Sequence, residues 1–545
     1  MRAEYTFREL GVNELALSLI EGAEIANEFF PTIRPLADCV ARKIAELERC
    51  TQASPEHRSS IAAILRRQQP LPEEPNIIKA LKNLEEGAFL LVSGQQAGVC
   101  LGPMYTLIKA AALIALRNKL SRELPEHRFV ALFWAGGMDH DFSEIKCCYV
   151  HDRERRLRSV CMKQPDGTTG QPVGRIKLTP EGAARLPQLI DIMPATDHTP
   201  GLRKAVAECY APGKTYSLAF RELLAGQLAE HGLLIFESED EEAKALGKAL
   251  FASSVERQDE EAALLGQRNS RIGELGFELQ VSALEDETNL FLIAGNGMRD
   301  KLVRVEGGFA TKAGQERFTA EELRKRVELN PASLSFGVML RPVFQQALFP
   351  VAVYLGGTSE AAYWAQMYPL FNLHGLPEPL LVPRPGFTLV SRRTARLLDR
   401  YKLELTDFLQ PQHELLRQLS ARAIPPTLSH RIRELQSVFT RYATEMRDDA
   451  VKLDEGLGGV LDTLSANFHK HLATVEKKIA QAAKRKDDLL VQHVSELFEA
   501  LMPQGKLQER TLTALSAINE YGPTVIDAIR DACEFPPPGH RVITL

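Results

Sequence analysis

The chain has 545 residues, and at roughly 150 residues per domain this length predicts about three to four domains. Hydrophobic residues make up 44% of the sequence and charged residues 25%, proportions that exclude the collagen-like and disordered classes. The 66 basic and 71 acidic residues leave a formal charge of −5, so the overall charge gives no reason to expect a nucleic-acid partner.

Neither a membrane segment nor a metal site is predicted. No stretch of about 18 uncharged apolar residues occurs, and the first residues carry charges where a signal peptide needs an apolar core. We therefore expect a cytoplasmic protein with no membrane partner. The eight cysteines, at positions 39, 50, 100, 147, 148, 161, 209 and 533, form no C-x-x-C pair and no repeated spacing. This argues against a zinc site or a disulfide framework, and in a reducing cytosol they are expected to be small buried hydrophobes.

The first predicted elements are helices, followed by a strand, a glycine-rich loop and another helix. Apolar residues at helical spacing predict helices within residues 1–85, and the short apolar run at 88–92 predicts a buried strand. The next helix is expected from Pro103 to about Leu116. Further strands are predicted at 129–134, 233–236, 351–355 and 379–382. Because these strands alternate with helical segments, they predict an α/β fold with a doubly wound parallel sheet.

The predicted sheet is interrupted twice, because long segments separate its second, third and fourth strands. The segments 147–230 and 261–345 are the predicted insertions, and both contain turn-rich stretches. The chain is therefore expected to divide into an N-terminal helical segment at 1–85, a sheet core at 86–146, 231–260 and 346–387, the two insertions, a helical coiled-coil domain at 388–505, and a final helix and tail at 506–545.

The segment 388–500 has the composition of long, charged helices. Apolar residues recur at every seventh position, at Leu461, Phe468, Val475, Ala482 and Leu489. Their apolar partners drift by one place in the heptad, which is typical of a nearly straight helix that packs over several turns. The pattern fits either an intramolecular helical hairpin or a coiled coil between chains. We expect the second arrangement, and with it a homodimer.

The loop after the first strand is a candidate ligand-binding turn. Its glycines have the spacing G-x3-G-x3-G, which is neither the dinucleotide nor the Walker pattern. Glycines let the backbone approach a ligand, and free N–H groups at a helix start favour an anion. The alternative is a tight turn that needs glycine for packing. The candidate binding residues are Gly94, Gln95, Gln96, Gly98, Gly102, Tyr105 and Lys109.

The second strand ends in the triplet Asp139, His140 and Asp141. In an open α/β sheet, loops at the carboxyl ends of the strands line the ligand crevice. Two carboxylates around an imidazole could orient it as a general base, or could bind Mg²⁺. The alternative is that an aspartate caps the next helix and that the histidine is an ordinary loop residue. We take all three as catalytic candidates.

A third glycine turn follows the fourth strand. Thr358 or Ser359 could cap the next helix, and Glu360 could hold an amine or a hydroxyl group, or could itself be only a helix cap. Two arginines suit a carboxylate or a phosphate, although each could equally form a structural salt bridge. The candidate binding residues here are Arg341, Tyr354, Gly356, Gly357, Glu360 and Arg384.

Four long motifs make the sequence recognisable. They are SGQQAGVCLGPMYTLIK at 93–109, FWAGGMDHDFSEI at 133–145, RPVFQQALFPVAVYLGGTSEAAYWAQ at 341–366, and LMPQGKLQER at 501–510. In this order they resemble the BshC family of bacillithiol-biosynthesis cysteine-adding enzymes, and the resemblance extends to the final GHRV. It implies a Rossmann-type core related to class I nucleotidyltransferases, two connecting insertions and a C-terminal coiled-coil domain used for dimerisation.

The resemblance also implies an activity. Enzymes of this family are believed to add L-cysteine to glucosaminyl malate, forming an amide between the cysteine carboxylate and the sugar amine in the last step of bacillithiol synthesis. Amide formation from a free acid needs activation, so ATP is expected as a cosubstrate, with or without Mg²⁺. Because the chain has no H-x-G-H, K-M-S-K-S or P-loop signature, ATP use is implied by analogy alone.

On this resemblance, His140 or Asp139 is expected to take the proton from the attacking amine. Arg341, Lys109 or Arg384 is expected to hold malate carboxylates or phosphate, and Glu360 to orient an amine or a hydroxyl group. The chain departs from the family pattern at Met138, Gly337, Thr358 and Ser359. Two alternatives stay open: another nucleotidyltransferase-like ligase or acyl-transfer enzyme, and a coiled-coil interaction protein with a degenerate Rossmann core.

Overall fold

The computed structural model describes residues 2–281, 286–422, 426–486 and 488–545, without the side chains of 421, 422, 426 and 482–486. It divides into two compact units, each described here by itself. One unit comprises residues 390–505, and the other comprises residues 2–389 together with 506–545. In the described part of the chain, no helix combines the length and the apolar character needed to cross a bilayer.

The larger unit is built on a parallel five-stranded sheet. Its strands are β2 (Phe89–Gln96), β3 (Phe129–Gly136), β6 (Leu234–Glu237), β12 (Val351–Gly356) and β13 (Leu380–Pro383). They lie in the order β13-β12-β2-β3-β6, and every neighbouring pair is parallel. The five strands predicted from the sequence are thereby confirmed. Because chain order reverses between β2 and β12, a ligand crevice is expected at the carboxyl ends of these two strands.

Helices cover this sheet. Helix α5 (Tyr105–Glu123) follows β2, and α15 (Thr358–Met367) follows β12. Most of the α5 side chains are buried, as expected for a crossover helix packed inside a doubly wound fold. The N-terminal region supplies the predicted helices, preceded by the short strand β1 (Glu4–Tyr5). These helices are α1 (Glu14–Glu21), α2 (Leu36–Leu47), α3 (Pro55–Gln68) and α4 (Pro75–Glu85).

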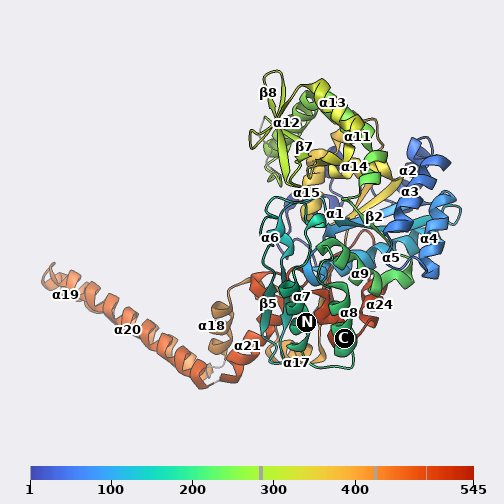
Figure 1. The fold of residues 1–545 in the computed structure, drawn as a ribbon. Helices are drawn as coiled ribbons and strands as arrows, with labels where there is room; N and C mark the ends of the chain where they lie inside the picture. Colours follow the sequence, from blue (N-terminus) through green and yellow to red (C-terminus); the bar gives the residue numbers. More distant parts are fainter. Residues whose placement is uncertain (1, 282–285, 423–425, 487) are drawn as a thin grey trace. The chain divides into compact units, whose positions relative to one another are not determined.

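Two segments interrupt the sheet. Between β3 and β6 lie the hairpin of β4 (Cys147–His151) and β5 (Leu157–Cys161) and the helices α7 (Pro180–Asp191), α8 (Thr199–Cys209) and α9 (Tyr216–Leu228). Between β6 and β12 lies an antiparallel sheet of order β10-β9-β8-β7-β11. Its strands are β7 (Glu287–Ile293), β8 (Arg299–Val305), β9 (Gly308–Thr311), β10 (Arg317–Phe318) and β11 (Leu334–Phe336), and Figure 1 shows β7 and β8 beside the helices α11 (Lys248–Glu256), α12 (Gln258–Glu274) and α13 (Ala320–Leu329).

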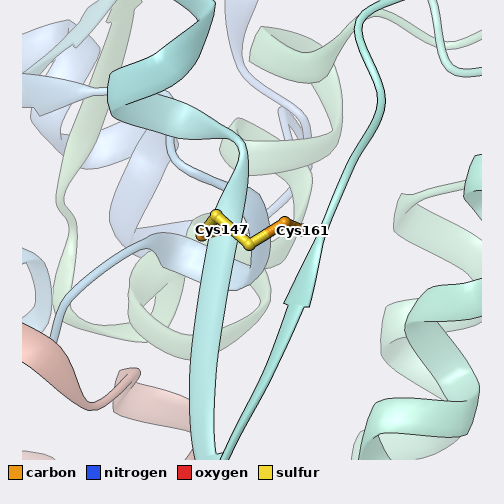
Figure 2. The surroundings of a disulfide bond; sticks show 2 residues. All are labelled: Cys147 and Cys161. Carbon is orange, nitrogen blue, oxygen red and sulfur yellow. A yellow bond between two sulfur atoms is a disulfide. The ribbon is translucent and has the colours of Figure 1, made fainter.

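One pair of cysteines is bonded, although no disulfide was expected. Cys147 and Cys161 form a disulfide bond (Figure 2), so the prediction of cysteines without disulfide pairing is wrong for these two. Antiparallel pairing of β4 with β5 places the two residues directly opposite each other, with their Cα atoms 4.1 Å apart. The register of this hairpin decides the pairing, and the spacing of cysteines along the chain gives no sign of it. The other six cysteines are free.

A third sheet joins the two ends of the larger unit. Strand β15 (His540–Thr544) lies between β1 and β14 (Gly386–Val390). His540 is buried, and its Nε2 lies 2.8 Å from the Thr388 hydroxyl. Residues after 505 are therefore part of the same core as the parallel sheet.

The smaller unit is helical. Its long helices α19 (Pro426–Leu453) and α20 (Leu457–Lys486) form a hairpin (Figure 1), flanked in sequence by α17 (Arg392–Tyr401), α18 (Gln412–Arg422) and α21 (Asp488–Leu501). Phe468 from the predicted heptad stacks on Phe439 across this hairpin. The two helices therefore pair within one chain. This is the intramolecular hairpin, which was the alternative to the expected coiled coil between chains. Val475 and Leu489 are exposed, and the side chain of Ala482 lies outside the described residues.

Candidate active site

A pocket of about 370 Å³ lies at the carboxyl edge of the parallel sheet, where β2, β3 and β12 end. This volume is within the range of small-molecule sites. The predicted residues that line it are Gly94, Gln95, Gln96, Tyr105, Lys109, Asp139, Arg341, Tyr354, Gly357, Glu360 and Arg384. The predicted residues outside this lining are Gly98, Gly102, His140, Asp141 and Gly356.

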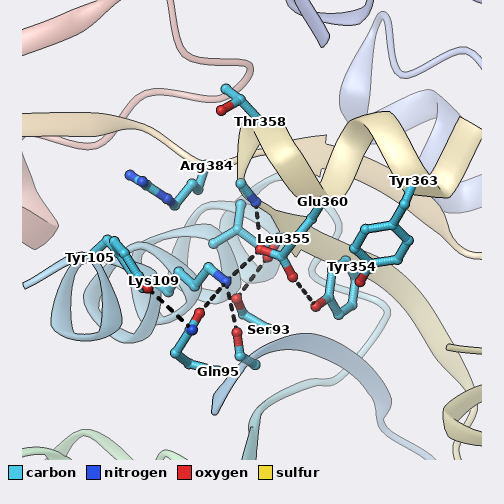
Figure 3. Close-up of polar contacts among 12 residues, drawn as sticks. Ser93, Gln95, Tyr105, Lys109, Tyr354, Leu355, Thr358, Glu360, Tyr363 and Arg384 are labelled. Atoms are coloured by element: carbon cyan, nitrogen blue, oxygen red, sulfur yellow. Dashed lines mark hydrogen bonds and ion pairs between the residues drawn. The ribbon is translucent and has the colours of Figure 1, made fainter. Parts of the chain in front are cut away.

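Lys109 is buried on α5 and fully engaged by the protein (Figure 3). Its Nζ donates to the Gly94 carbonyl at 2.8 Å and to Gln95 Oε1 at 3.0 Å, and it lies 2.5 Å from Glu360 Oε2. An ammonium group has three protons, and these three acceptors account for all of them. Burial lowers the pKa of Lys109, and the Glu360 charge opposes this shift. Lys109 therefore ties β2 to α15, and no N–H of it is left over for a substrate anion.

Glu360 is the partner of Lys109 and the cap of α15. Its Oε2 accepts a hydrogen bond from the Gly357 N–H at 2.8 Å, and its Oε1 accepts one from the Tyr354 hydroxyl at 2.6 Å. Burial opposes ionisation, but Lys109 and Tyr354 hold the pKa of Glu360 below its usual value. Gly357 is the N-cap of this helix, so the expected cap by Thr358 or Ser359 is wrong. The capping alternative for Glu360 is confirmed.

Arg384 forms a structural ion pair with Glu509. Two of its nitrogens donate to the Glu509 carboxylate, at 2.7 and 3.1 Å, and the side chains are 8% and 3% exposed. Burial would raise the pKa of Glu509, but the charges of Arg384 and His540 lower it to about 2. The pair joins the end of β13 to the C-terminal segment, while Arg384 also lines the pocket.

Arg341 has no carboxylate partner among the described residues. Its Nη2 donates to the Tyr363 hydroxyl at 2.8 Å and lies 3.5 Å from the Tyr354 hydroxyl. The guanidinium also lies over the rings of Trp134 and Tyr354. A guanidinium has five N–H donors in a planar fork, so Arg341 keeps donors for a carboxylate or phosphate oxygen.

Asp139 lies in the pocket wall and is held by its neighbours. Its carboxylate accepts hydrogen bonds from the His140 N–H at 2.7 Å, from Gln96 Nε2 at 3.2 Å and from Arg299 Nη1 at 3.2 Å. Burial alone would raise the pKa of Asp139, but the His140 hydrogen bond and the Arg299 charge lower it to about 2. Asp139 is therefore an ionised carboxylate with low affinity for a proton.

His140 and Asp141 lie outside the lining of the pocket. Arg299 Nη1 donates to His140 Nδ1 at 2.9 Å, and because a guanidinium cannot accept a hydrogen bond, this ring nitrogen is the acceptor. Asp141 is the N-cap of α6 (Phe142–Ile145) and accepts from the Ser143 N–H at 2.9 Å. The alternative role of Asp141 as a helix cap is thus confirmed. His140 contacts Arg299, which lies on β8 in the second insertion.

The first glycine loop uses its backbone donors internally. The N–H groups of residues 98, 100, 102 and 104 donate to Gln96, Tyr210, Val99 and Leu512 respectively. A Cβ atom on Gly98 would lie 2.9 Å from the Gly102 Cα, so the two glycines allow the loop to fold against itself. Close packing, the alternative given above, explains these glycines, and no free row of N–H groups remains here for an anion.

The kind of protein that carries this pocket follows from comparison with known families. The model described as "Bacillithiol biosynthesis BshC, N-terminal Rossmann-like domain" matches residues 1–385, and the model described as "Bacillithiol biosynthesis BshC, C-terminal coiled-coil domain" matches residues 387–545. The chain belongs to the BshC family. Membership confirms the resemblance and the fold class, a Rossmann-like core with a C-terminal coiled-coil domain.

Individual relatives match this BshC-family chain over most of its length. A protein named "Putative cysteine ligase BshC" from Koribacter versatilis is 29% identical over 94% of both chains, and one of the same name from Solibacter usitatus is 31% identical over 90% of both. These relatives make the chain an enzyme of the ligase class. Among solved structures, one titled as a putative arginyl-tRNA synthetase from Campylobacter jejuni matches 78% of this chain and 94% of that one, with 11% identity and a TM-score of 0.23.

Three charged residues at this site of the BshC-family chain were not predicted from the sequence. Glu144 and Arg510 line the pocket, and Arg299 contacts Asp139 and His140. Glu144 and Arg510 stand inside the recognised motifs, so a search for charged residues within those motifs would have found them. No sequence signal pointed to Arg299, which reaches the site from the second insertion. Across the described residues, no group of three or more His, Cys, Asp and Glu side chains is arranged to hold a metal ion.

Proposed function

We propose that this chain joins L-cysteine to glucosaminyl malate in the cytoplasm, forming an amide bond between the cysteine carboxylate and the sugar amine. The observation that carries the proposal is the distribution of charge in the pocket. Arg341 and Arg510 have no carboxylate partner in the described part of the chain, and they share the cavity with the carboxylate of Glu144. Glucosaminyl malate has the matching chemistry, with two carboxylates on the malate and an amine on the sugar.

The proposed reaction uses ATP to activate the cysteine carboxylate. Water favours the free acid and amine over the amide, so a leaving group on the carboxyl carbon is needed. The charge of the pocket suits an anionic cosubstrate, because Arg341 and Arg510 line it and neither has a carboxylate partner among the described residues. Arg510 at the same time donates to the Thr358 hydroxyl at 3.2 Å, which positions it over the start of α15.

Direct incubation tests the function. The purified protein is mixed with ATP, L-cysteine and glucosaminyl malate, and mass spectrometry follows the thiol product together with AMP and ADP. Formation of the amide only when all three reactants are present supports the proposal, and the nucleotide released identifies the activated intermediate. Nucleotide turnover that ignores glucosaminyl malate would instead indicate a different ligase of the same fold.

Substitution Arg341→Gln is expected to weaken binding of glucosaminyl malate. Loss of a charged hydrogen-bond donor costs about 1.5–3 kcal/mol, which corresponds to a rise in KM of roughly 10–100-fold. Steady-state kinetics with varied glucosaminyl malate measure this rise. The control is Arg324→Gln, which removes an exposed arginine paired with Glu256. An unchanged KM in Arg341→Gln would show that the malate carboxylates bind elsewhere.

We propose further that the chain forms a homodimer through its helical hairpin. Leu435, Tyr442 and Met446 of α19 are 52%, 53% and 55% exposed, and Val460 and Leu464 of α20 are 62% and 48% exposed. Large apolar side chains gathered on one pair of helices indicate a protein interface. A second copy of the chain is the occupant we propose, because the pairing of α19 with α20 leaves this apolar surface uncovered.

Sedimentation of the full chain tests the dimer. The wild-type protein is expected to sediment as a dimer, and the double variant Leu435→Glu/Tyr442→Glu as a monomer, because two charges per chain would be buried at the interface. Leu329→Glu is the matched control, since Leu329 is an 81% exposed leucine of the larger unit. A wild-type monomer at all accessible concentrations would contradict the proposal.

A further inference from the structure

We propose that Glu144 is the catalytic base that takes the proton from the substrate amine. The inference rests on the proposed function and assigns one step of it to a residue that the expected roles of Asp139 and His140 left out. Glu144 belongs to the short helix α6 and lines the same pocket as Arg341. Three carboxylates line this pocket, those of Asp139, Glu144 and Glu360.

Two of these carboxylates are occupied by the protein. Glu360 is bound by Lys109, by the Tyr354 hydroxyl and by the Gly357 N–H. Asp139 is bound by Arg299, by Gln96 and by the His140 N–H. A carboxylate that accepts several hydrogen bonds and faces a cation is stabilised in its ionised form and has little affinity for a proton. Neither group is suited to remove a proton near neutral pH.

Glu144 differs from both, because it has no hydrogen-bond or ion-pair partner among the described residues. In the described part of the chain, no hydrogen bond or ion pair joins its carboxylate to another residue. The residue is open to solvent, and its carboxylate reaches the cavity without first breaking a contact. The imidazole of His140 is a weaker alternative, because its Nδ1 is engaged by Arg299 and the residue lies outside the lining of the pocket.

The charged groups around Glu144 favour its protonated form. Desolvation by the surrounding protein is the largest cause that raises the pKa of Glu144, and the negative charges of Asp139 and Asp141 add to it. Together they raise this pKa to about 7. Glu360 adds to this shift from α15, and Lys109 on α5 opposes it. Tyr105 also faces Glu144, and burial together with the Glu144 charge raises the pKa of that phenol to about 12, so Tyr105 stays neutral. A general base is most effective when its pKa lies near the pH at which the enzyme works.

The proposed step balances as follows. The sugar ammonium gives one proton to the Glu144 carboxylate, and its nitrogen thereby regains a lone pair. The nitrogen attacks the carbonyl carbon of the activated cysteine, an acyl phosphate or acyl adenylate formed with ATP. The new C–N bond forms, and the C–O bond to the phosphate group breaks with its electron pair leaving on that oxygen. The second proton of the nitrogen passes to water, and Glu144 later releases its own proton to solvent.

The test is the pH dependence of kcat and of kcat/KM for glucosaminyl malate in amide formation by the full chain, from about pH 5.5 to about pH 9. Wild-type kcat/KM is expected to rise with pH through about 7, because kcat/KM reports ionisation of the free enzyme and only the ionised carboxylate accepts a proton. Glu144→Gln is expected to lose roughly 10²–10⁴-fold in kcat and to lose this inflection, with KM changed far less. In Glu144→Ala, added acetate or formate is expected to restore part of the rate. Glu126→Gln, at an exposed glutamate of the same unit, is the control.

The outcomes separate the inference from the function. If the wild-type protein forms no amide, the proposed function fails. If it forms amide and Glu144→Gln keeps the wild-type kcat and the same inflection, the assignment of Glu144 is overturned while the function stands. Thermal melting reports whether Glu144→Gln folds. If it does not fold, Glu144→Asp decides, because it keeps a carboxylate: a reduced kcat with an inflection supports the base, and no inflection in either this variant or the wild type overturns it.

Discussion

Lys109→Met is expected to lower the free energy of unfolding of the larger unit by about 3–5 kcal/mol, the usual result of removing one partner of a buried ion pair. The substitution leaves Glu360 without its cation, and it leaves the Gly94 carbonyl and Gln95 Oε1 without their donor. Urea unfolding followed by tryptophan fluorescence measures the effect. Both tryptophans, Trp134 and Trp364, are buried in this unit, so the signal reports on it alone.

Two further variants make this result specific. Lys119→Met removes a lysine from the same helix, where it pairs with Glu123 on the partly exposed surface, and it is expected to cost less than about 1 kcal/mol. Lys109→Met/Glu360→Gln removes both charges and is expected to recover part of the loss. Equal destabilisation by Lys109→Met and Lys119→Met would show that the pair does not hold β2 to α15.

Glu509→Gln is expected to destabilise the same unit at neutral pH by about 3–5 kcal/mol, because Arg384 is then buried without a counter-charge. The destabilisation caused by Glu509→Gln is expected to become smaller as pH falls. The pKa of Glu509 is about 2 in the folded protein against its usual 4.5, so the folded state binds this proton less tightly than the unfolded state does. Its contribution to stability is therefore complete above about pH 4.5 and is lost as pH falls towards 2.

Urea unfolding at several pH values measures this difference. The gap in stability between wild type and Glu509→Gln is expected to be largest above pH 4.5 and to narrow below it. His540 also faces this pair, and burial lowers its pKa to about 4, so both proteins lose some stability between the usual histidine value of 6.5 and about 4. Glu316→Gln, which removes a half-exposed partner of Arg326, serves as the control. A gap that stays constant down to pH 3 would refute the assigned role of Glu509.

The two ion pairs explain why few charged groups are free in the pocket. Each ion pair, Lys109–Glu360 and Arg384–Glu509, joins elements that are far apart in the sequence. Because each charge is neutralised by its partner, these four side chains are not available to bind a substrate charge. Asp139 is similarly held by Arg299. What remains for a substrate is a small set of side chains without such partners. The proposed roles of Arg341, Arg510 and Glu144 follow from this remainder.

The sequence by itself was sufficient to predict the sheet. Each of the five parallel strands is a short apolar run between turn residues, and burial on both faces requires this pattern. The loops at the carboxyl ends follow from strand direction, which predicts that Asp139, Lys109 and Glu360 lie at one edge of the sheet. The four motifs identified the family, and the family models confirm it.

The roles of individual side chains depend on contacts that no local pattern encodes. Glu360 follows a glycine turn in a way that suits either a helix cap or a ligand, and only its contacts with the Gly357 N–H and with Lys109 identify it as a cap and ion-pair partner. Arg299 reaches Asp139 from an insertion 160 residues further along the chain. The Cys147–Cys161 disulfide depends on the register of a hairpin.

Sequence alone thus determined the fold class, the family and the edge of the parallel sheet where the pocket lies, because burial and strand direction are reflected in local sequence patterns. Tertiary structure alone decided which charged side chains in that pocket are paired and which are free. The physical reason is that the protonation and availability of a side chain depend on the charges and hydrogen-bond partners that folding brings around it. Only the folded chain shows that, among the described residues, Glu144 has no hydrogen bond or ion pair and Arg510 has no carboxylate partner.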